Sequence, residues 1–311
     1  MIEEGPRARL RRLVAARSPL VVPGAYDGVS ARLIEEAGFE AVYMTGYGTS
    51  AARLGLPDLG FAGLGDMVEN VRQMAAAVSI PLVADADTGY GGVLAVERTV
   101  RAYEAAGAAA LHIEDQVSPK RCGHLAGKAI VPLAEMVAKV RAAVAARRDP
   151  DLLIIARTDA RAVTGFDEAL ARGRAYGEAG ADILFVEAPT SRAEIETIPS
   201  RLERPCLFNY VPGGQSPLPS LGELAAWGYA IVLLPVQTLF AATRAMRDYL
   251  AALRRTPDAR TLDDRLTSFA DFNALVGVPA LLERERAYGD RSAAGRGHPF
   301  DPDAGRGRER P

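Results

Sequence analysis

The stretch "HIEDQVSPKRCGHLAGK", residues 112–128, gathers side chains that could do chemistry together. Two acids close an apolar run, and two cations, a thiol and an imidazole follow a proline, at Glu114, Asp115, Lys120, Arg121, Cys122 and His124. A thiol placed directly after two cations should have a lowered pKa and be reactive, as a nucleophile or as a general acid/base. The turn-like "SPK" and "CGH" predict a mobile loop that could close over a ligand as a lid. The alternative is a solvated basic loop with an incidental cysteine.

A second group of acids suits a metal ion. Asp85 and Asp87 alternate at the end of the apolar run "PLVADADTG", and Glu114 ends the next run. Magnesium is held by one or two carboxylates, with water and substrate completing its shell. A zinc site is poorly supported, because Cys122 has no second cysteine nearby. The alternative is that Asp87 and Thr88 merely cap the following helix.

The loop "TGYGTS", residues 45–50, resembles an anion site, because glycines let backbone N–H groups approach a carboxylate closely. Arg157 could hold a carboxylate by a two-pronged hydrogen bond. The alternative for Arg157 is a salt bridge to Asp159 or Glu187.

Eight near-continuous apolar runs recur along the chain, with helix-forming segments between them, at residues 20–27, 41–46, 81–89, 110–116, 152–160, 183–189, 205–211 and 230–236. Runs of this kind are typical of parallel strands covered on both faces. Four similar stretches, such as "EAAGAAAL" and "EAGADIL", place a glycine between a helix end and the next strand. The pattern predicts an α/β fold, a (β/α)₈ TIM-type barrel, whose reactive groups lie at the carboxyl ends of the strands. A doubly wound sheet is the alternative, but "PGAYDG" after the first strand is not its usual phosphate loop.

We expect residues 1–255 to form the catalytic barrel. An amphipathic stretch at 262–289 exceeds what an eight-unit barrel needs and predicts a helical extension, residues 256–290, packed on a partner subunit. The tail, residues 291–311, is rich in glycine, proline and charge and is expected to be disordered.

Bulk properties favour a small-molecule enzyme. The 311 residues carry a formal net charge of −2, which does not suggest nucleic acid or a membrane as the partner. No apolar stretch has the length of a membrane span, and the N-terminus lacks an apolar signal core. The two cysteines, Cys122 and Cys206, fit a reducing compartment. We therefore expect a cytoplasmic protein.

The chain resembles the isocitrate lyase/phosphoenolpyruvate mutase superfamily over about residues 10–290. The matching blocks are "VVPGAYDGVSARLIEEAGF", "MTGYGTSAARLGLPDLG", "ADADTGYG", "ARTDA" and "EDQVSPKRCGH", of which "KRCGH" is the most specific. The resemblance implies a modified barrel, dependence on Mg²⁺ (with Mn²⁺ as an alternative), and a homotetramer whose subunits exchange a late helix.

Residue roles follow from the same resemblance. The metal and its water shell correspond to Asp58, Asp85, Asp87 and Glu114, and the keto-acid carboxylate site to Thr45, Gly46, Tyr47 and Arg157. Cys122 matches the acid/base of the lyase branch, with Lys120, Arg121 and His124 in the gating loop, and Glu187 and Asn209 line the pocket. The family usually has serine and glycine at the positions of Thr45 and Tyr47, so a bulky Tyr47 bears on the size of the substrate.

The expected reaction is magnesium-dependent cleavage of a C–C bond in a 2-hydroxy di- or tricarboxylate of the methylisocitrate or dimethylmalate kind. One product is an α-keto acid such as pyruvate, and Cys122 protonates the other fragment. Tyr43 or a metal-bound water is the candidate base, and Pro235 fits the lyase branch. The rivals are carboxyphosphonoenolpyruvate mutase-type C–P chemistry, oxaloacetate decarboxylation or hydrolysis on the same site, and a non-catalytic ligand-binding barrel.

Overall fold

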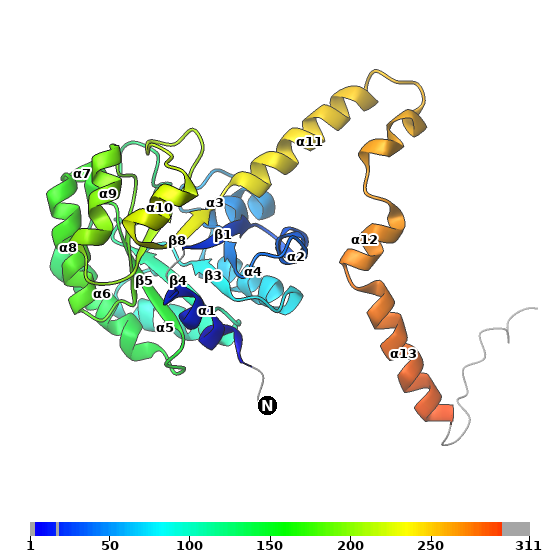
Figure 1. Ribbon diagram of the computed structural model, residues 1–311. Coiled ribbons are helices and arrows are strands. Elements are labelled where there is room, and N and C mark those ends of the chain that lie inside the picture. The colour runs from blue at the N-terminus through cyan, green and yellow to red at the C-terminus, as the bar shows by residue number, and fades with distance from the viewer. Residues whose placement is uncertain (1–3, 17–18, 294–311) are drawn as a thin grey trace, which may run out of the picture. The chain divides into compact units, whose positions relative to one another are not determined.

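Eight parallel strands close into a barrel, as the apolar runs predicted (Figure 1). The computed structural model describes residues 4–16 and 19–293. The strands pair in chain order and β1 closes against β8; they are β1 (Leu20–Ala25), β2 (Val42–Met44), β3 (Leu82–Asp85), β4 (Ala110–Glu114), β5 (Leu153–Thr158), β6 (Ile183–Val186), β7 (Cys206–Asn209) and β8 (Tyr229–Leu234). The doubly wound alternative is therefore excluded.

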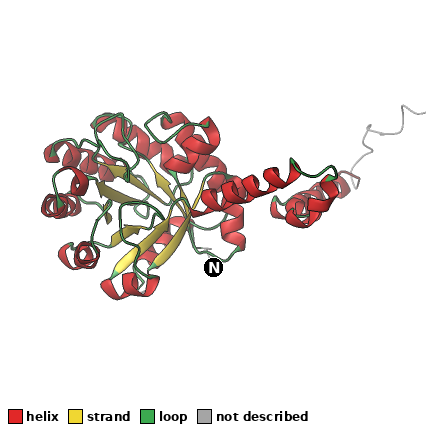
Figure 2. Cartoon of the chain, turned by 90° about the horizontal axis from the view of Figure 1, so that it is seen from above, coloured by secondary structure: helices red, strands yellow, loops and turns green. Residues whose placement is uncertain are grey.

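Helices surround the barrel and cover the outer faces of its strands (Figure 2). They are α1 (Pro6–Val14), α2 (Gly28–Glu36), α3 (Gly46–Thr49), the π-helix η1 (Ser50–Leu54), α4 (Leu64–Ala77), α5 (Val93–Ala105), α6 (Leu133–Ala146), α7 (Ala160–Val163), α8 (Phe166–Glu178), α9 (Arg192–Arg201), α10 (Leu221–Trp227) and α11 (Gln237–Leu253). The predicted glycine turns are confirmed: Gly107 and Gly180, for example, take φ of +100° and +106° between a helix and the next strand.

Two apolar layers hold the barrel together. One lies between the strands and the outer helices, where Met44, Leu111 and Phe208 are buried. The other fills the barrel interior, and Leu10 of α1 belongs to it. Successive strand residues therefore serve opposite layers, which explains why the runs are apolar throughout instead of alternating.

The chain divides into two compact units, of which the first ends at Arg254 and the second begins at Arg255, one residue from the predicted boundary. The second unit holds the 3₁₀ helix η2 (Ala259–Arg265), α12 (Phe269–Leu275) and α13 (Val278–Ala293). The amphipathic stretch at 262–289 is thus interrupted, at Gly277 with φ of +84°. Helix α13 also continues into the segment expected to be disordered, and the rest of that tail, 294–311, lies outside the described residues. Among the described residues, no helix is both long and apolar enough to span a membrane.

Candidate active site

A pocket of about 320 Å³ opens at the carboxyl ends of the strands. All the site residues predicted from the sequence line it except Gly46, Asp87 and Glu114. Each of these three contacts a lining residue: Gly46 N–H donates to Asp85, Asp87 pairs with Lys120, and Glu114 pairs with Arg157. The barrel therefore assembles one site from residues of many strands, as the strand-end argument predicted.

The loop after β4 is ordered and lies over this pocket. We call residues 118–128 the lid and the pairing beside it the stem: Val117 N–H donates to Ala129 O at 2.8 Å, and Gln116 bridges to Ile130. The Gln116 side chain bonds both the N–H and the carbonyl of Arg121, and Cys122 N–H reaches Asp58 O at 3.2 Å. The alternative of a solvated basic loop fits only part of the lid: Arg121 and residues 125–127 are exposed, whereas Lys120 and Gly123 are buried.

Lys120 lies between two predicted metal-shell carboxylates. Its Nζ is 2.5 Å from Asp58 Oδ1 and 2.7 Å from Asp87 Oδ1, and the side chain is 6% exposed. Burial alone would lower the pKa of Lys120, but Asp87 and Asp58 outweigh it and hold that pKa well above its usual value. Asp87 does not cap the next helix, because α5 begins at Val93 with Gly92 as its N-cap. The capping alternative is therefore wrong.

The buried charges at this end of the barrel do not balance. Three cations, Lys120, Lys128 and Arg157, face six buried carboxylates, those of Asp58, Asp85, Asp87, Glu114, Asp159 and Glu187. Burial raises the pKa of Glu114 well above its usual value despite Arg157, and its Oε1 has no hydrogen-bond partner among the residues that the structure describes. An excess of buried negative charge with an unpaired acceptor fits a divalent cation held largely through water.

Direct ligation by three side chains is not arranged. Within residues 4–16 and 19–293, no three His, Cys, Asp or Glu side chains form a group that could hold a metal ion. Asp85 has one oxygen facing Gly46 N–H at 3.2 Å and the other accepting from Asp87 N–H at 2.9 Å. The residues present thus fit a magnesium ion with one or two carboxylate ligands and a mostly aqueous shell.

Arg157 was expected to hold a substrate carboxylate, but its guanidinium pairs with a carboxylate of the protein. Its Nε is 2.9 Å from Asp159 Oδ2 and its Nη2 is 3.1 Å from Asp159 Oδ1, so its two-pronged bond goes to a protein carboxylate. Glu114 at 3.3 Å and Glu187 at 3.5 Å lie against the same guanidinium. The salt-bridge alternative is correct, although Arg157 still lines the pocket.

The "TGYGTS" loop also uses its donors internally. Gly46 N–H meets Asp85, and Gly48 N–H donates to Thr45 Oγ1 at 3.3 Å, which caps the short helix α3. These N–H groups therefore hold the loop and Asp85 in place instead of facing a free anion. Tyr47 lines the pocket and meets the ring of Phe240 from α11 edge-on, with centroids 6.3 Å apart.

The pKa of the Cys122 thiol is raised, whereas the sequence predicted that it would be lowered. Burial raises its pKa to about 11, and the carboxylates of Asp58 and Glu187 add to the rise. The neighbouring cations do not lower it as expected, because Lys120 is paired with carboxylates and Arg121 turns its guanidinium to Ala126 O. At neutral pH the thiol is protonated, which suits a proton donor and not a thiolate nucleophile.

Alkylation would measure this pKa directly. Because only the thiolate reacts, labelling of Cys122 by iodoacetamide should accelerate about tenfold per pH unit between pH 8 and 10. At pH 7.5 it should be about two orders of magnitude slower than free cysteine, whose pKa is near 8.5. Mass spectrometry of the peptide that holds Cys122 gives the rate. A rate that levels off by pH 8 would show instead that the cations activate the thiol.

Two residues that contact the predicted site residues were missed from the sequence, His112 and Gln215. His112, buried in β4, has Nε2 2.8 Å from the Tyr43 hydroxyl, and it stands two residues before Glu114, on the same face of the strand. That two-residue spacing from Glu114 is the sequence signal that could have identified His112. Gln215 N–H donates to His124 Nδ1 at 3.0 Å, a pairing 91 residues apart that no local pattern announces.

Comparison with known proteins finds clear relatives over most of the chain. The family model for phosphoenolpyruvate phosphomutase matches residues 10–254. The chain is 45% identical over 281 residues to 2,3-dimethylmalate lyase of Eubacterium barkeri, covering 90% of this chain and 97% of that protein. It is 42% identical over 282 residues to 2-methylisocitrate lyase of Aeropyrum pernix, covering 91% of each.

Solved structures agree with these relatives. Oxaloacetate acetylhydrolase bound to 3,3-difluorooxalacetate superposes with a TM-score of 0.87 at 38% identity, over 95% of this chain and 99% of that one. Phosphonopyruvate hydrolase, in complex with oxalate and Mg²⁺, gives a TM-score of 0.81 at 33% identity, over 92% and 99%. The family match and the identities together show that the chain belongs to the phosphoenolpyruvate mutase/isocitrate lyase superfamily.

Proposed function

We propose that this protein is a magnesium-dependent carbon–carbon lyase that cleaves a 2-hydroxy dicarboxylate into an α-keto acid, such as pyruvate, and a second carboxylate. The observation that carries the proposal is the placement of Cys122 in a pocket that Asp85 and Arg157 also line, where burial raises the pKa of the thiol. Cleavage next to a hydroxyl-bearing carbon leaves an electron pair on the departing fragment, and that fragment needs a proton donor. Cys122 is a donor of this kind, held in place by the lid.

The proton of the substrate hydroxyl needs an acceptor. Burial, together with the charge of Asp85, raises the pKa of Tyr43 well above 10, so Tyr43 alone is a poor base. Burial lowers the pKa of His112, which therefore stays neutral and can accept a proton. We infer that Tyr43 takes the substrate proton as its own proton passes to His112, 2.8 Å away.

The steps balance without any further reactant. The C–C bond beside the hydroxyl breaks as the hydroxyl proton leaves toward Tyr43, and a carbonyl forms at that carbon. The electrons of the broken bond go to the other fragment, which takes the proton of Cys122. Bound magnesium supplies positive charge for the keto-acid end. Arg157, held between Asp159 and Glu187, adds a fixed cation at the same end of the pocket.

The apolar part of the pocket lining favours an alkyl substituent on the substrate. We call this part the apolar wall; it consists of Tyr47, Leu125, Val211, Pro212, Pro235, Val236 and Phe240. Burying a carboxylate against the apolar wall would cost desolvation energy, so a third carboxylate would have to face Arg121 or His124 instead. A methyl or larger alkyl substituent would instead gain apolar contact.

A product assay tests the proposal. The purified protein with Mg²⁺ would be offered 2,3-dimethylmalate, 2-methylisocitrate, isocitrate, oxaloacetate and phosphonopyruvate, with EDTA controls, and products followed by NMR. We expect metal-dependent pyruvate and a second carboxylate from the dimethylmalate. Turnover of oxaloacetate or phosphonopyruvate alone would favour the rival chemistry on this site, to which the oxaloacetate acetylhydrolase likeness gives weight. Silence on every substrate would favour a ligand-binding barrel.

Three further proposals accompany the function. The metal is Mg²⁺, with Mn²⁺ as a substitute, in line with the magnesium and oxalate bound to phosphonopyruvate hydrolase. The protein is a cytoplasmic homotetramer in which the extension, residues 256–290, packs on a partner subunit. Helix α11 supports that arrangement, because none of its residues is buried and Met246 and Leu250 are 55% and 60% exposed.

A further inference from the structure

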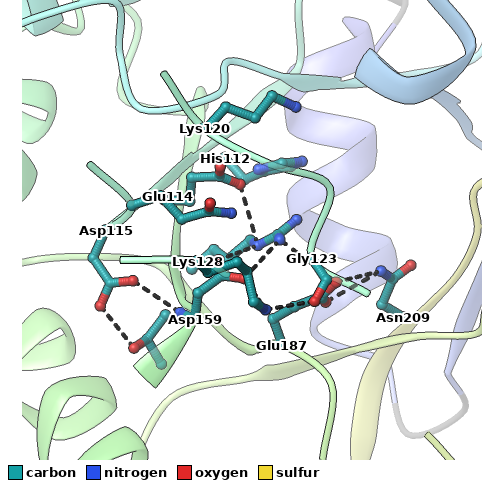
Figure 3. A network of polar contacts seen from close by, with 12 residues as sticks. His112, Glu114, Asp115, Lys120, Gly123, Lys128, Asp159, Glu187 and Asn209 are labelled. Carbon is teal, nitrogen blue, oxygen red and sulfur yellow. Dashed lines mark hydrogen bonds and ion pairs between the residues drawn. The ribbon is translucent and has the colours of Figure 1, made fainter. Parts of the chain in front are cut away.

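Lys128 is the one lysine of the lid that does not line the pocket. Its side chain is only 1% exposed, and its Nζ is 2.7 Å from Asp159 Oδ1 (Figure 3). The same ammonium donates to the carbonyl of Gly123, the residue after Cys122. A buried cation that bridges a lid carbonyl and a barrel carboxylate needs a reason other than contact with substrate.

Lys128 and Asp159 are both held in place relative to the barrel. Lys128 adjoins the stem, where Ala129 pairs with Val117. Asp159 is held at the end of β5, because its N–H donates to Asp115 Oδ1 at 2.8 Å while its carboxylate grips Arg157. Lys128 can therefore act as a fixed point to which the lid backbone at Gly123 is tied.

The lid backbone at Gly123 lies close against the side chains of Glu187 and Arg157. A side chain added at Gly123 would collide with the Glu187 carboxylate and the Arg157 guanidinium, so the backbone itself lies on this ion pair. In this position the carbonyl of Gly123 accepts from the Lys128 ammonium. The same contact fixes the backbone one residue after Cys122.

We propose that Lys128 is a positioning residue that latches the lid: it ties the Gly123 peptide, and with it Cys122, to the carboxylate that orients Arg157. The latch couples closure of the lid to the alignment of the pocket arginine, since Asp159 serves both. Lys120 and His124 also anchor the lid, but they contact Asp58, Asp87 and Glu187, which belong to the pocket and its metal site. Of the two tests below, the measurement of kcat rests on the proposed function, whereas the digestion does not.

Limited trypsin digestion of the full chain tests the latch without any substrate. Lys128→Met keeps the length of the side chain but removes its charge and donors. We expect cleavage after Lys120 or Arg121, in the lid, to accelerate about tenfold or more relative to cleavage after Arg201 in the same molecule. Arg201 is exposed and ends α9, at the opposite end of the barrel from the lid, so general loosening would raise both rates. An unchanged ratio would overturn the proposal.

A second pair of variants distinguishes loss of the latch from misfolding. Asp159→Asn and Asp159→Asn/Lys128→Met differ only in the lysine, and the double variant leaves no unpaired charge from the bridge. The lid should be cut faster in the double variant, because Lys128 still holds Gly123 in the single one. In the lyase assay, Lys128→Met should lower kcat about tenfold or more with little change in KM, since Cys122 is misplaced while the binding groups remain. Equal lid cutting in the two Asp159 variants would refute the latch, whatever the protein catalyses.

Discussion

Replacing Cys122 by serine is expected to lower kcat by about three orders of magnitude while leaving KM nearly unchanged. A serine hydroxyl is a much weaker acid than a thiol, even than one whose pKa burial has raised to about 11. The variant can still bind, because the acidic cluster, Arg157 and the apolar wall are intact. Steady-state rates with the hydroxy acid that the product assay identifies give kcat and KM, and calorimetry with oxalate and Mg²⁺ gives binding separately.

Cys206→Ser is the matched control. Cys206 is buried in β7 within the layer between strands and helices, and its thiol lies 3.4 Å from Arg204 O, where a serine hydroxyl could donate. This variant should keep the activity of the parent. If Cys122→Ser retained full turnover, the thiol would have no part in the reaction, and the proton donor would have to be sought among the other pocket groups.

The architecture followed from local signals. Eight apolar runs separated by helix formers specified eight parallel strands, and glycines such as Gly107 marked the turns between helix and strand. Strand ends then predicted which side chains share a pocket, because all parallel strands of a barrel end on the same side. The site inventory was therefore available from the sequence, down to Glu187 and Asn209 at the ends of neighbouring strands.

The charged partners of the site residues could not be predicted from the sequence in this way. Lys120 stands two residues before Cys122 and was expected to acidify it, yet its ammonium is taken up by Asp58, 62 positions away. Arg157 was expected to await a substrate carboxylate, but Asp159 already satisfies it. A pKa depends on burial and on every charge within a few ångströms, and most of those neighbours are distant in the chain. Residue types thus predicted the membership of the site but not the protonation of its thiol.

Replacing Asp87 by asparagine is expected to weaken Mg²⁺ binding about 10- to 100-fold and to reduce activity with it. The change keeps the shape of the side chain but removes one of the six carboxylates whose unbalanced charge fits a cation. Calorimetric titration with Mg²⁺ measures the affinity. Asp27→Asn is the matched control, since Asp27 stands at the end of β1 but caps α2, a role that asparagine fills equally well. Equal Mg²⁺ affinity in Asp87→Asn and the parent would refute the metal assignment.

Thermal stability separates loss of the metal from loss of the fold. Burial raises the pKa of Asp87 to about 6, although Lys120 opposes the rise, whereas an unfolded aspartate has a pKa near 3.9. A carboxyl whose folded pKa is raised destabilises the fold once the pH exceeds its unfolded pKa, because the charged form is disfavoured only in the folded state. At pH 7, therefore, metal-free Asp87→Asn should melt at or above the temperature of the metal-free parent. Mg²⁺ should raise the Tm of the parent more than that of the variant, because only the parent retains the full acidic cluster. A metal-free variant that melted well below the parent would mean that Asp87 holds the fold through Lys120, and the acidic cluster would then be a structural ion-pair network.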